Sequence, residues 1–280
     1  MRGARPLAAM FGVWACAVAA FALVLSRVLQ NPGERATVSM GFWLLVIWVA
    51  AGRALQYRYR EPAGRALSRL RAPWRVRFVL LATAFALVEE AVTTSLTNLA
   101  PLFGVPVGCG FITASANYLD VVLGHSVIVF IPMFIAWAWM LGCWAFQPLD
   151  VLLLFGITGW LAELLTFGTQ NVGMGGFWVG VYGLMVYLPA RALPERPAGL
   201  PRVTVLRAFA AVFLPFLFVP LTAVPVWLLH PYQHHWEYPA PPGCMERPPQ
   251  RGGRAAPAAP TNPAAPAIPA ATGHPNEVPQ

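Results

Sequence analysis

Residues 78–100 read FVLLATAFALVEEAVTTSLTNLA, and this stretch decides the fold class. A helix that crosses the ~30 Å hydrocarbon core of a bilayer needs about 20 mostly apolar residues, and this run is long enough. Its two acidic residues, Glu89 and Glu90, stand near its middle rather than at its ends. We therefore predict a membrane-spanning helix that holds ionisable groups inside the lipid layer.

The composition of the whole chain supports this interpretation. Of its 280 residues, 58% are hydrophobic and 11% are charged, whereas soluble domains average about 25% charged residues. A soluble fold of this length would leave too much apolar surface in water. The expected fold class is therefore all-α, a polytopic transmembrane helical bundle.

About seven segments are long and apolar enough to span a membrane, and each is expected to be a helix. They cover approximately residues 7–29, 38–55, 78–100, 117–144, 151–168, 175–190 and 208–229, with a possible bend at Pro132. Residues 1–237 form the transmembrane bundle. Residues 238–280 are rich in Pro and Ala, which predicts a disordered tail.

All 19 basic residues are Arg, and they are unevenly distributed. Eight fall between Arg53 and Arg77, and four more between Arg191 and Arg207. Under the positive-inside rule both loops are cytoplasmic, so the N-terminus lies inside and the C-terminus outside. An arginine-only basic set is typical of a GC-rich bacterial genome, which favours a multi-pass protein of the inner (plasma) membrane.

The charge pattern also excludes other classes of protein. A nucleic-acid binder needs basic residues spread over a folded face, so the lipid bilayer is the expected partner and nucleic acid is not. Without Lys, the chain cannot form a retinal-type Schiff base. The four cysteines contain no CxxC pair, and we interpret them as small buried hydrophobes rather than a disulfide framework or a zinc site: Cys16, Cys109, Cys143 and Cys244.

Three carboxyl groups are expected deep in the membrane. Glu90 is thirteen residues beyond Arg77, and Glu163 is thirteen beyond Asp150, so each lies about 20 Å along its helix. A charge that faces lipid there costs roughly 2.5–3.5 kcal/mol. Glu89, Glu90 and Glu163 should therefore face the bundle interior. Because no Arg or Lys lies in this region, they require protons, a cation, water or neutral hydrogen-bonding groups.

The surroundings of the two predicted acidic spans are alike. Each places a Thr three residues and an Asn eight residues after its glutamate, with Thr93 and Asn98 following Glu90, and Thr166 and Asn171 following Glu163. The constant offset of 73 residues suggests a parallel internal repeat of two helical hairpins. The alternative is that such Thr and Asn residues only bridge neighbouring helices.

Further polar residues begin the fourth predicted span, and under the topology above all of these groups collect in the outer half of the membrane. We therefore expect an outward-opening polar cavity that binds a ligand. Its candidate residues are Glu89, Glu90, Thr94, Asn98, Asn117, Asp120, His125, Glu163, Thr166 and Asn171.

Three functions are compatible with such a cavity. The first is a cation- or proton-linked transporter or solute-binding membrane protein. The second is an intramembrane enzyme of hydrolase or hydratase type that acts on a lipid or peptide through Glu90, His125 and Glu163. The third is a non-catalytic assembly protein whose polar residues join helices. The pattern predicts no metal site and indicates no particular cofactor, and it leaves open whether the protein is an enzyme.

Overall fold

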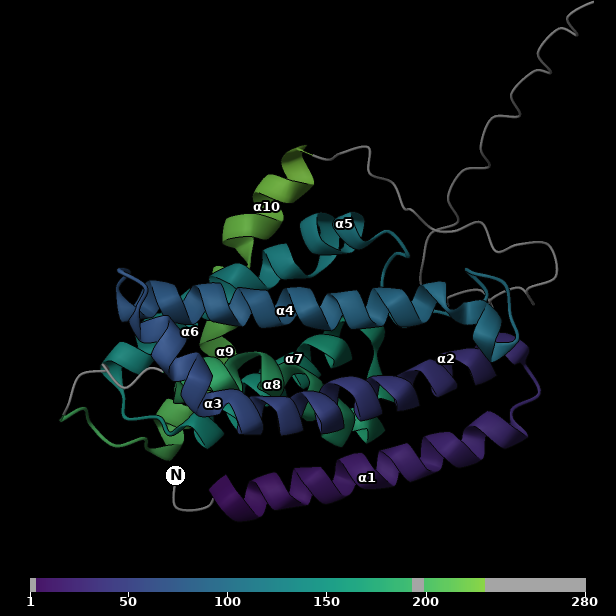
Figure 1. Cartoon of the computed structure of the whole chain (residues 1–280), viewed down its shortest axis with the longest axis horizontal. Coiled ribbons are helices and arrows are strands. Elements are labelled where there is room, and N and C mark those ends of the chain that lie inside the picture. The colour runs from purple at the N-terminus through teal and green to yellow at the C-terminus, as the bar shows by residue number, and fades with distance from the viewer. Residues whose placement is uncertain (1–3, 193–198, 230–280) are drawn as a thin grey trace, which may run out of the picture. The chain divides into compact units, whose positions relative to one another are not determined.

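The computed structural model describes residues 4–192 and 199–229, in which every regular element is helical (Figure 1). The predicted tail, residues 238–280, lies outside the described residues. The α-helices are α1 (Ala4–Val28), α2 (Pro32–Leu44), α3 (Arg53–Ser68), α4 (Trp74–Asn98), α5 (Tyr118–Asp120), α6 (Val127–Cys143), α7 (Pro148–Phe167), α8 (Gly175–Arg191), α9 (Val205–Phe218) and α10 (Pro220–Leu229). The shorter turns are η1 (Leu45–Gly52), η2 (Ala100–Phe103), η3 (Val121–His125) and η4 (Thr169–Met174).

Five helices in the described part of the chain are long and apolar enough to cross a membrane, and six if one bent pair is a single span. These helices match all the predicted spans except the third, which corresponds to α4. The all-helical prediction is thus confirmed for the described residues. The number of seven spans stays a prediction.

The second predicted span is much longer than expected. α2 continues through the π-helical η1 into α3, which gives one helix of 37 residues, Pro32–Ser68. At 1.5 Å per residue it is about 55 Å long, well beyond the ~30 Å hydrocarbon core. The arginines that were expected in a loop after residue 55 therefore begin on a helical extension of the span.

The bend in the fourth predicted span is not at Pro132. Tyr118–His125 and Val127–Cys143 meet at 48°, with Ser126 between them. Pro132 lies inside α6 without breaking it. Its missing N–H leaves the carbonyl of Ile128 without an intrahelical donor, and the Thr222 hydroxyl on α10 donates to that carbonyl over 2.9 Å.

The most extensive helix pairing among the described residues is that of α7 with α8, and glycines line it. A Cβ atom on Gly156 would lie 2.5 Å from the Val179 carbonyl oxygen, and one on Gly183 would lie 2.6 Å from the Leu152 oxygen. On another face of α8, a Cβ on Gly176 would lie 2.5 Å from the Ala15 nitrogen of α1. The small residues therefore allow backbones to approach closely, as expected for helices packed within a membrane.

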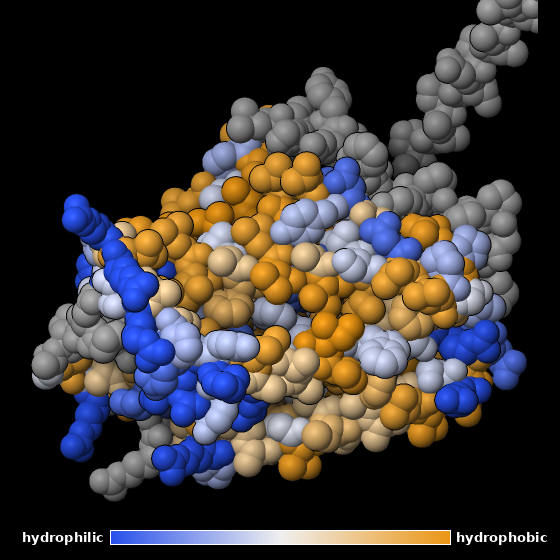
Figure 2. Space-filling view, viewed as in Figure 1, coloured by the Kyte–Doolittle hydropathy of each residue, from blue (hydrophilic) through white to orange (hydrophobic). Residues whose placement is uncertain are grey.

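The face of the bundle seen in Figure 2 is largely apolar along the sides of its helices. Large exposed apolar residues occur on α1, α4, α7 and α9, among them Phe21, Leu80, Leu165 and Leu217, whereas α8 has none. Hydrophilic residues gather at the ends of the helices instead, most densely over α3 (Figure 2). This distribution suits a bundle with lipid around its sides and water at its ends.

The interpretation of all cysteines as buried thiols is wrong for two of them. Cys109, in the connection between α4 and α5, is disulfide-bonded. Cys16 on α1 is an exposed thiol, and Cys143 at the end of α6 is a half-buried thiol. Widely separated cysteines carried no pairing signal, and a thiol on a lipid-facing helix surface needs no burial. Cys244 lies outside the described residues.

Candidate functional site

Glu89, Glu90 and Glu163 form one group in the interior of the bundle, which we call the acidic cluster. Their exposed fractions are 4%, 6% and 9% respectively. The carboxyl groups of Glu89 and Glu90 lie within hydrogen-bonding reach of each other, and Glu163 lies close enough to interact electrostatically with both. The structure therefore brings together three carboxyl groups from two helices, α4 and α7.

Hydroxyl groups surround Glu90. The Thr93 hydroxyl donates to Glu90 Oε2 over 3.1 Å. The side chains of Ser126 and Thr113 also lie within hydrogen-bonding reach of the Glu90 carboxyl. These partners come from α4 itself, from the break between η3 and α6, and from the connection that precedes α5. The bend at Ser126 thus places this side chain beside the acidic cluster, while its hydroxyl donates to the Val121 carbonyl over 3.3 Å.

Glu163 is held by a tyrosine from the neighbouring helix. The Tyr182 hydroxyl on α8 donates to Glu163 Oε1. A Cβ atom on Gly159 would collide with the Tyr182 ring, so this glycine, one turn before Glu163, makes room for the ring against α7. The Tyr182 ring also packs on Phe130 and Trp178, with ring centroids 5.7 Å apart in both pairs. Three aromatic rings from α6 and α8 therefore pack together beside Glu163.

The negative charge of this group has no basic counterpart among the described residues. Ion pairs among those residues include Arg60 with Glu61 and His125 with Asp120. The three clustered glutamates take part in neither, and their hydrogen-bond partners are hydroxyl groups and one another. Burial without a cation is costly in a low-dielectric interior, so the arrangement favours uptake of protons or of a positively charged ligand.

Among the candidate residues, Thr94 lies four positions after Glu90 and has a hydroxyl group without a hydrogen-bond partner in the described part of the chain. Its side chain is buried, and its hydroxyl oxygen has no hydrogen-bond partner in the structure. A buried hydroxyl usually finds a partner, so an orphaned one beside an acidic group is a feature that a bound ligand or water would satisfy.

Asn98 and Asn117 have local structural roles. Asn98 Nδ2 donates to the carbonyls of Thr94 and Ala116 at 2.9 and 2.8 Å, which ties the end of α4 to the following connection. The side chain of Asn117 caps α5 by accepting from the backbone of Leu119 and Asp120. Both asparagines are exposed, and no contact joins either one to the glutamates.

Asp120 and His125 form a pair of their own. His125 Nε2 lies 3.7 Å from Asp120 Oδ2, with the His125 side chain 47% exposed and that of Asp120 6% exposed. The arrangement of Glu90, His125 and Glu163 as one catalytic group stays a prediction, since the ion-pair partner of His125 is Asp120. No group of three His, Cys, Asp or Glu side chains in residues 4–192 and 199–229 is placed to hold a metal ion.

The second half of the proposed repeat does not reproduce the first. Thr166 is exposed, unlike the buried Thr93 at the corresponding position. Asn171, in η4, accepts the indole hydrogen bond of Trp160 at its backbone carbonyl and that of Trp178 at its side-chain Oδ1. It therefore fastens η4 to the flanking helices, which is an adequate structural reason for an asparagine at this place.

Several residues around the glutamates were not among the candidates, namely Thr93, Thr113, Tyr118, Ser126 and Tyr182. Tyr118 lies near Glu90, and its hydroxyl donates a hydrogen bond to the Leu87 carbonyl over 3.0 Å. Thr93 and Ser126 stand beside predicted polar positions, so the same face argument could have included them. Nothing in the sequence marks Tyr182, because it reaches the glutamates only through the close packing of α7 and α8.

Comparison of the chain with protein-family models, with curated proteins and with solved structures finds no match. The class of protein therefore rests on the fold and the site. The apolar helices are compatible with an integral, multi-pass membrane protein. Its distinguishing feature is a buried set of acidic groups with hydroxyl partners.

Proposed function

We propose that this chain is a cation- or proton-linked transporter or solute-binding protein of the inner membrane, whose acidic cluster is the binding site. The observation that carries the proposal is the burial of Glu89, Glu90 and Glu163 together, with hydroxyl groups as their partners. Carboxylate and hydroxyl oxygens are the ligands that hard cations prefer, and a buried carboxyl can equally carry a proton.

We further propose seven spans, with α4 as the third. α4 has 25 residues, so it is about 38 Å long and could cross the bilayer. Its outward-facing positions include the apolar residues Leu80 and Val88, while both of its glutamates point inward. A helix whose glutamate side chains are buried and whose exposed side chains are apolar suits a lipid environment, although it contains ionisable residues.

The proposed orientation places the N-terminus in the cytoplasm and the C-terminus outside. Arg75 and Arg77 are at the start of α4, and the disulfide-bonded Cys109 follows its far end. Arginines favour the cytoplasmic side, and disulfides persist in the oxidising space outside it. The two signals are physically independent and support the same direction for α4.

An intramembrane enzyme is the second candidate, and the pairing of Glu163 with Tyr182 favours it. A carboxyl group hydrogen-bonded to a phenol can hold and deliver a proton in a site that excludes water. In this alternative Glu163 acts as general acid towards an apolar substrate, whereas His125 is paired with Asp120.

The proposal is tested with a Glu90→Gln/Glu163→Gln variant in proteoliposomes, assayed for proton uptake and for uptake of Na⁺, K⁺, Mg²⁺ and Ca²⁺. Amides keep hydrogen bonding but remove charge, so uptake should fall at least about tenfold. The matched control is Glu34→Gln, a similar substitution at an exposed position in the first turn of α2, and it should behave as wild type.

The outcome also separates the two candidates. Unchanged uptake and unchanged equilibrium binding of every cation in the folded double variant would count decisively against a ligand site at the acidic cluster. If wild-type protein moves no ion but converts a component of a membrane lipid extract, and the double variant does not, the enzyme is the better description. Mass spectrometry of the extract before and after incubation detects that conversion.

A further inference from the structure

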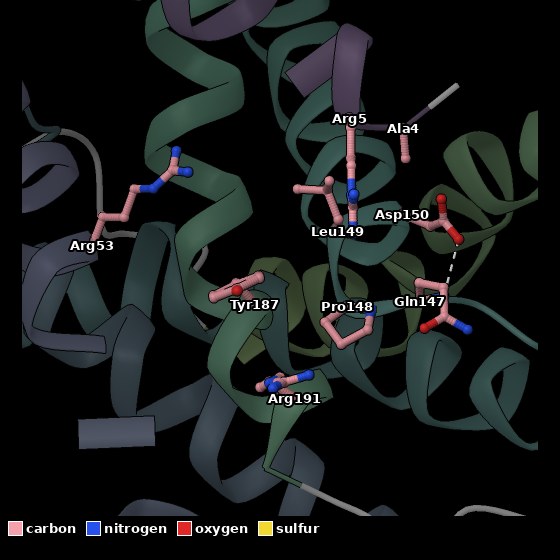
Figure 3. A pocket seen from close by; sticks show the side chains of 9 residues that line it. All are labelled: Ala4, Arg5, Arg53, Gln147, Pro148, Leu149, Asp150, Tyr187 and Arg191. Carbon is pink, nitrogen blue, oxygen red and sulfur yellow. Dashed lines mark hydrogen bonds between the residues drawn. The ribbon is translucent and has the colours of Figure 1, made fainter. Parts of the chain in front are cut away.

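A second site lies at the arginine-rich ends of the helices, where a cavity of about 600 Å³ opens. Its lining comes from four parts of the chain, namely the starts of α1, α3 and α7 and the end of α8. We call it the arginine cavity, after Arg5, Arg53 and Arg191. Figure 3 shows these three side chains approaching from different sides, with Tyr187 between them.

The lining of this cavity is positively charged. The guanidinium groups of Arg5, Arg53 and Arg191 form neither an ion pair nor a hydrogen bond with the described residues. The single carboxylate in the lining belongs to Asp150, which is fully buried and accepts the backbone N–H of Gln147 over 2.9 Å as a helix cap. Three exposed positive charges thus face one cavity, and the one nearby acid already serves the start of α7.

Packing between the helices keeps Arg53 beside the end of α8. Five residues before Arg53, the Trp48 indole donates to the Val181 carbonyl over 2.9 Å. Three residues after it, the buried Gln56 amide donates to the Leu184 carbonyl over the same distance. The helix that carries Arg53 is therefore fastened to α8 on both sides of this arginine.

The start of α1 is fixed as well. Ala4, next to Arg5, belongs to a buried apolar group with Phe11 of α1, Leu153 of α7 and Val179 of α8. Arg5 therefore starts from a backbone that is packed against both helices bordering the cavity. Positive charges that the fold holds together in this way repel one another, and an anion between them would relieve that repulsion.

We propose that the arginine cavity binds a phosphate-bearing anion. Guanidinium groups pair with phosphate through two parallel N–H···O bonds, which a planar fork achieves and a lysine does not. The phenol of Tyr187 adds a donor. The volume lies within the range of small-ligand pockets, so there is room for more than a bare phosphate ion. An anionic phospholipid headgroup and a soluble phosphate ester share this chemistry.

The test measures binding to the full-length chain in non-ionic detergent with two probes, dioctanoyl phosphatidylglycerol and inorganic phosphate. Arg53→Gln/Arg191→Gln should weaken binding of the recognised probe at least about tenfold. The matched control, Arg65→Gln/Arg69→Gln, removes the same two charges from exposed positions in and just after α3, and it should change binding less than about twofold.

Each result bears on the proposal. Binding of phosphatidylglycerol alone identifies a lipid headgroup, and binding of inorganic phosphate alone identifies a soluble ester. Binding of both, each weakened by the cavity variant, shows recognition of the phosphate group itself. If neither probe binds, or if the cavity and control variants weaken binding equally, the arginines only add to surface charge and the proposal fails.

Should the glutamine variant not fold, Arg53→Lys/Arg191→Lys keeps the charge. This variant is expected to bind the recognised probe about threefold more weakly than wild type.

Discussion

The acidic cluster and the arginine cavity each bring side chains of like charge together, but they do so in opposite environments. The clustered carboxyl groups are buried within the bundle and are satisfied by hydroxyl groups. The arginines of the cavity are exposed and make no ion pair with the described residues. Water can solvate the second group but not the first. The difference indicates that the stability of the fold depends on the hydrogen-bond partners of the glutamates. The arginines need no such partners within the protein, because water solvates them.

Removing the Glu90 side chain should give the largest effect. Glu90→Ala deletes the carboxyl group that accepts from the Thr93 hydroxyl and that the side chains of Thr113 and Ser126 approach, and it opens a void among them. Unsatisfied buried groups and cavities each cost a few kcal/mol, so we expect a loss of about 2–4 kcal/mol. The measurement is the unfolding midpoint in detergent, and Arg191→Ala is the counterpart in the other region, with a change within about 0.5 kcal/mol. Equal losses would mean that the two regions do not differ as described.

A smaller effect is expected from the two tyrosines of α8. Tyr182→Phe deletes the donor to Glu163, so stability should fall by about 1–3 kcal/mol and cation binding should weaken with it. Tyr187→Phe, on the same helix but lining the arginine cavity, should leave cation binding unchanged. Parallel titrations of the two variants give the comparison. Identical behaviour would mean that the cluster does not use Tyr182.

Ionic strength should separate the two regions without any mutation. Raising choline chloride from about 0.05 to 0.5 M shortens the Debye length from roughly 14 to 4 Å. Binding of phosphatidylglycerol to the exposed arginines should then weaken by about fivefold, while cation binding at the buried glutamates should change less than twofold. Isothermal titration at both salt concentrations measures this. A cation affinity that falls as steeply as lipid binding would place the cation at the surface.

The sequence allowed much of this comparison to be predicted, for energetic reasons. Segments with so few charges had to be helices in lipid, and carboxyl groups near their centres had to face inward. The structure agrees with the burial of Glu89, Glu90 and Glu163. The arginine cavity was not predicted, because the clustering of arginines by sequence indicates topology and not which three side chains approach one another.

The remaining site residues could not be separated by type alone. An asparagine near a membrane surface serves equally well as a ligand, a helix cap or a bridge, and Asn117 proves to be a cap. Tyr182 escaped notice because its contact with Glu163 depends on the missing side chain of Gly159 on another helix. Helical periodicity describes one helix at a time, whereas such contacts depend on how two helices are paired.

The proposed repeat supplies the finest test, since equivalent residues now differ in environment. Thr93 is buried and donates to Glu90 Oε2, whereas Thr166 lies near the exposed end of α7, beside Leu165 with 80% exposure. Thr93→Val should therefore cost about 1 kcal/mol through the lost hydrogen bond, and Thr166→Val should cost less than about 0.5 kcal/mol. Thermal midpoints of the two isosteric variants decide the matter. Equal losses would favour matching roles for the two threonines, and with them a functional repeat in which both hairpins contribute a glutamate and a hydroxyl to the same site.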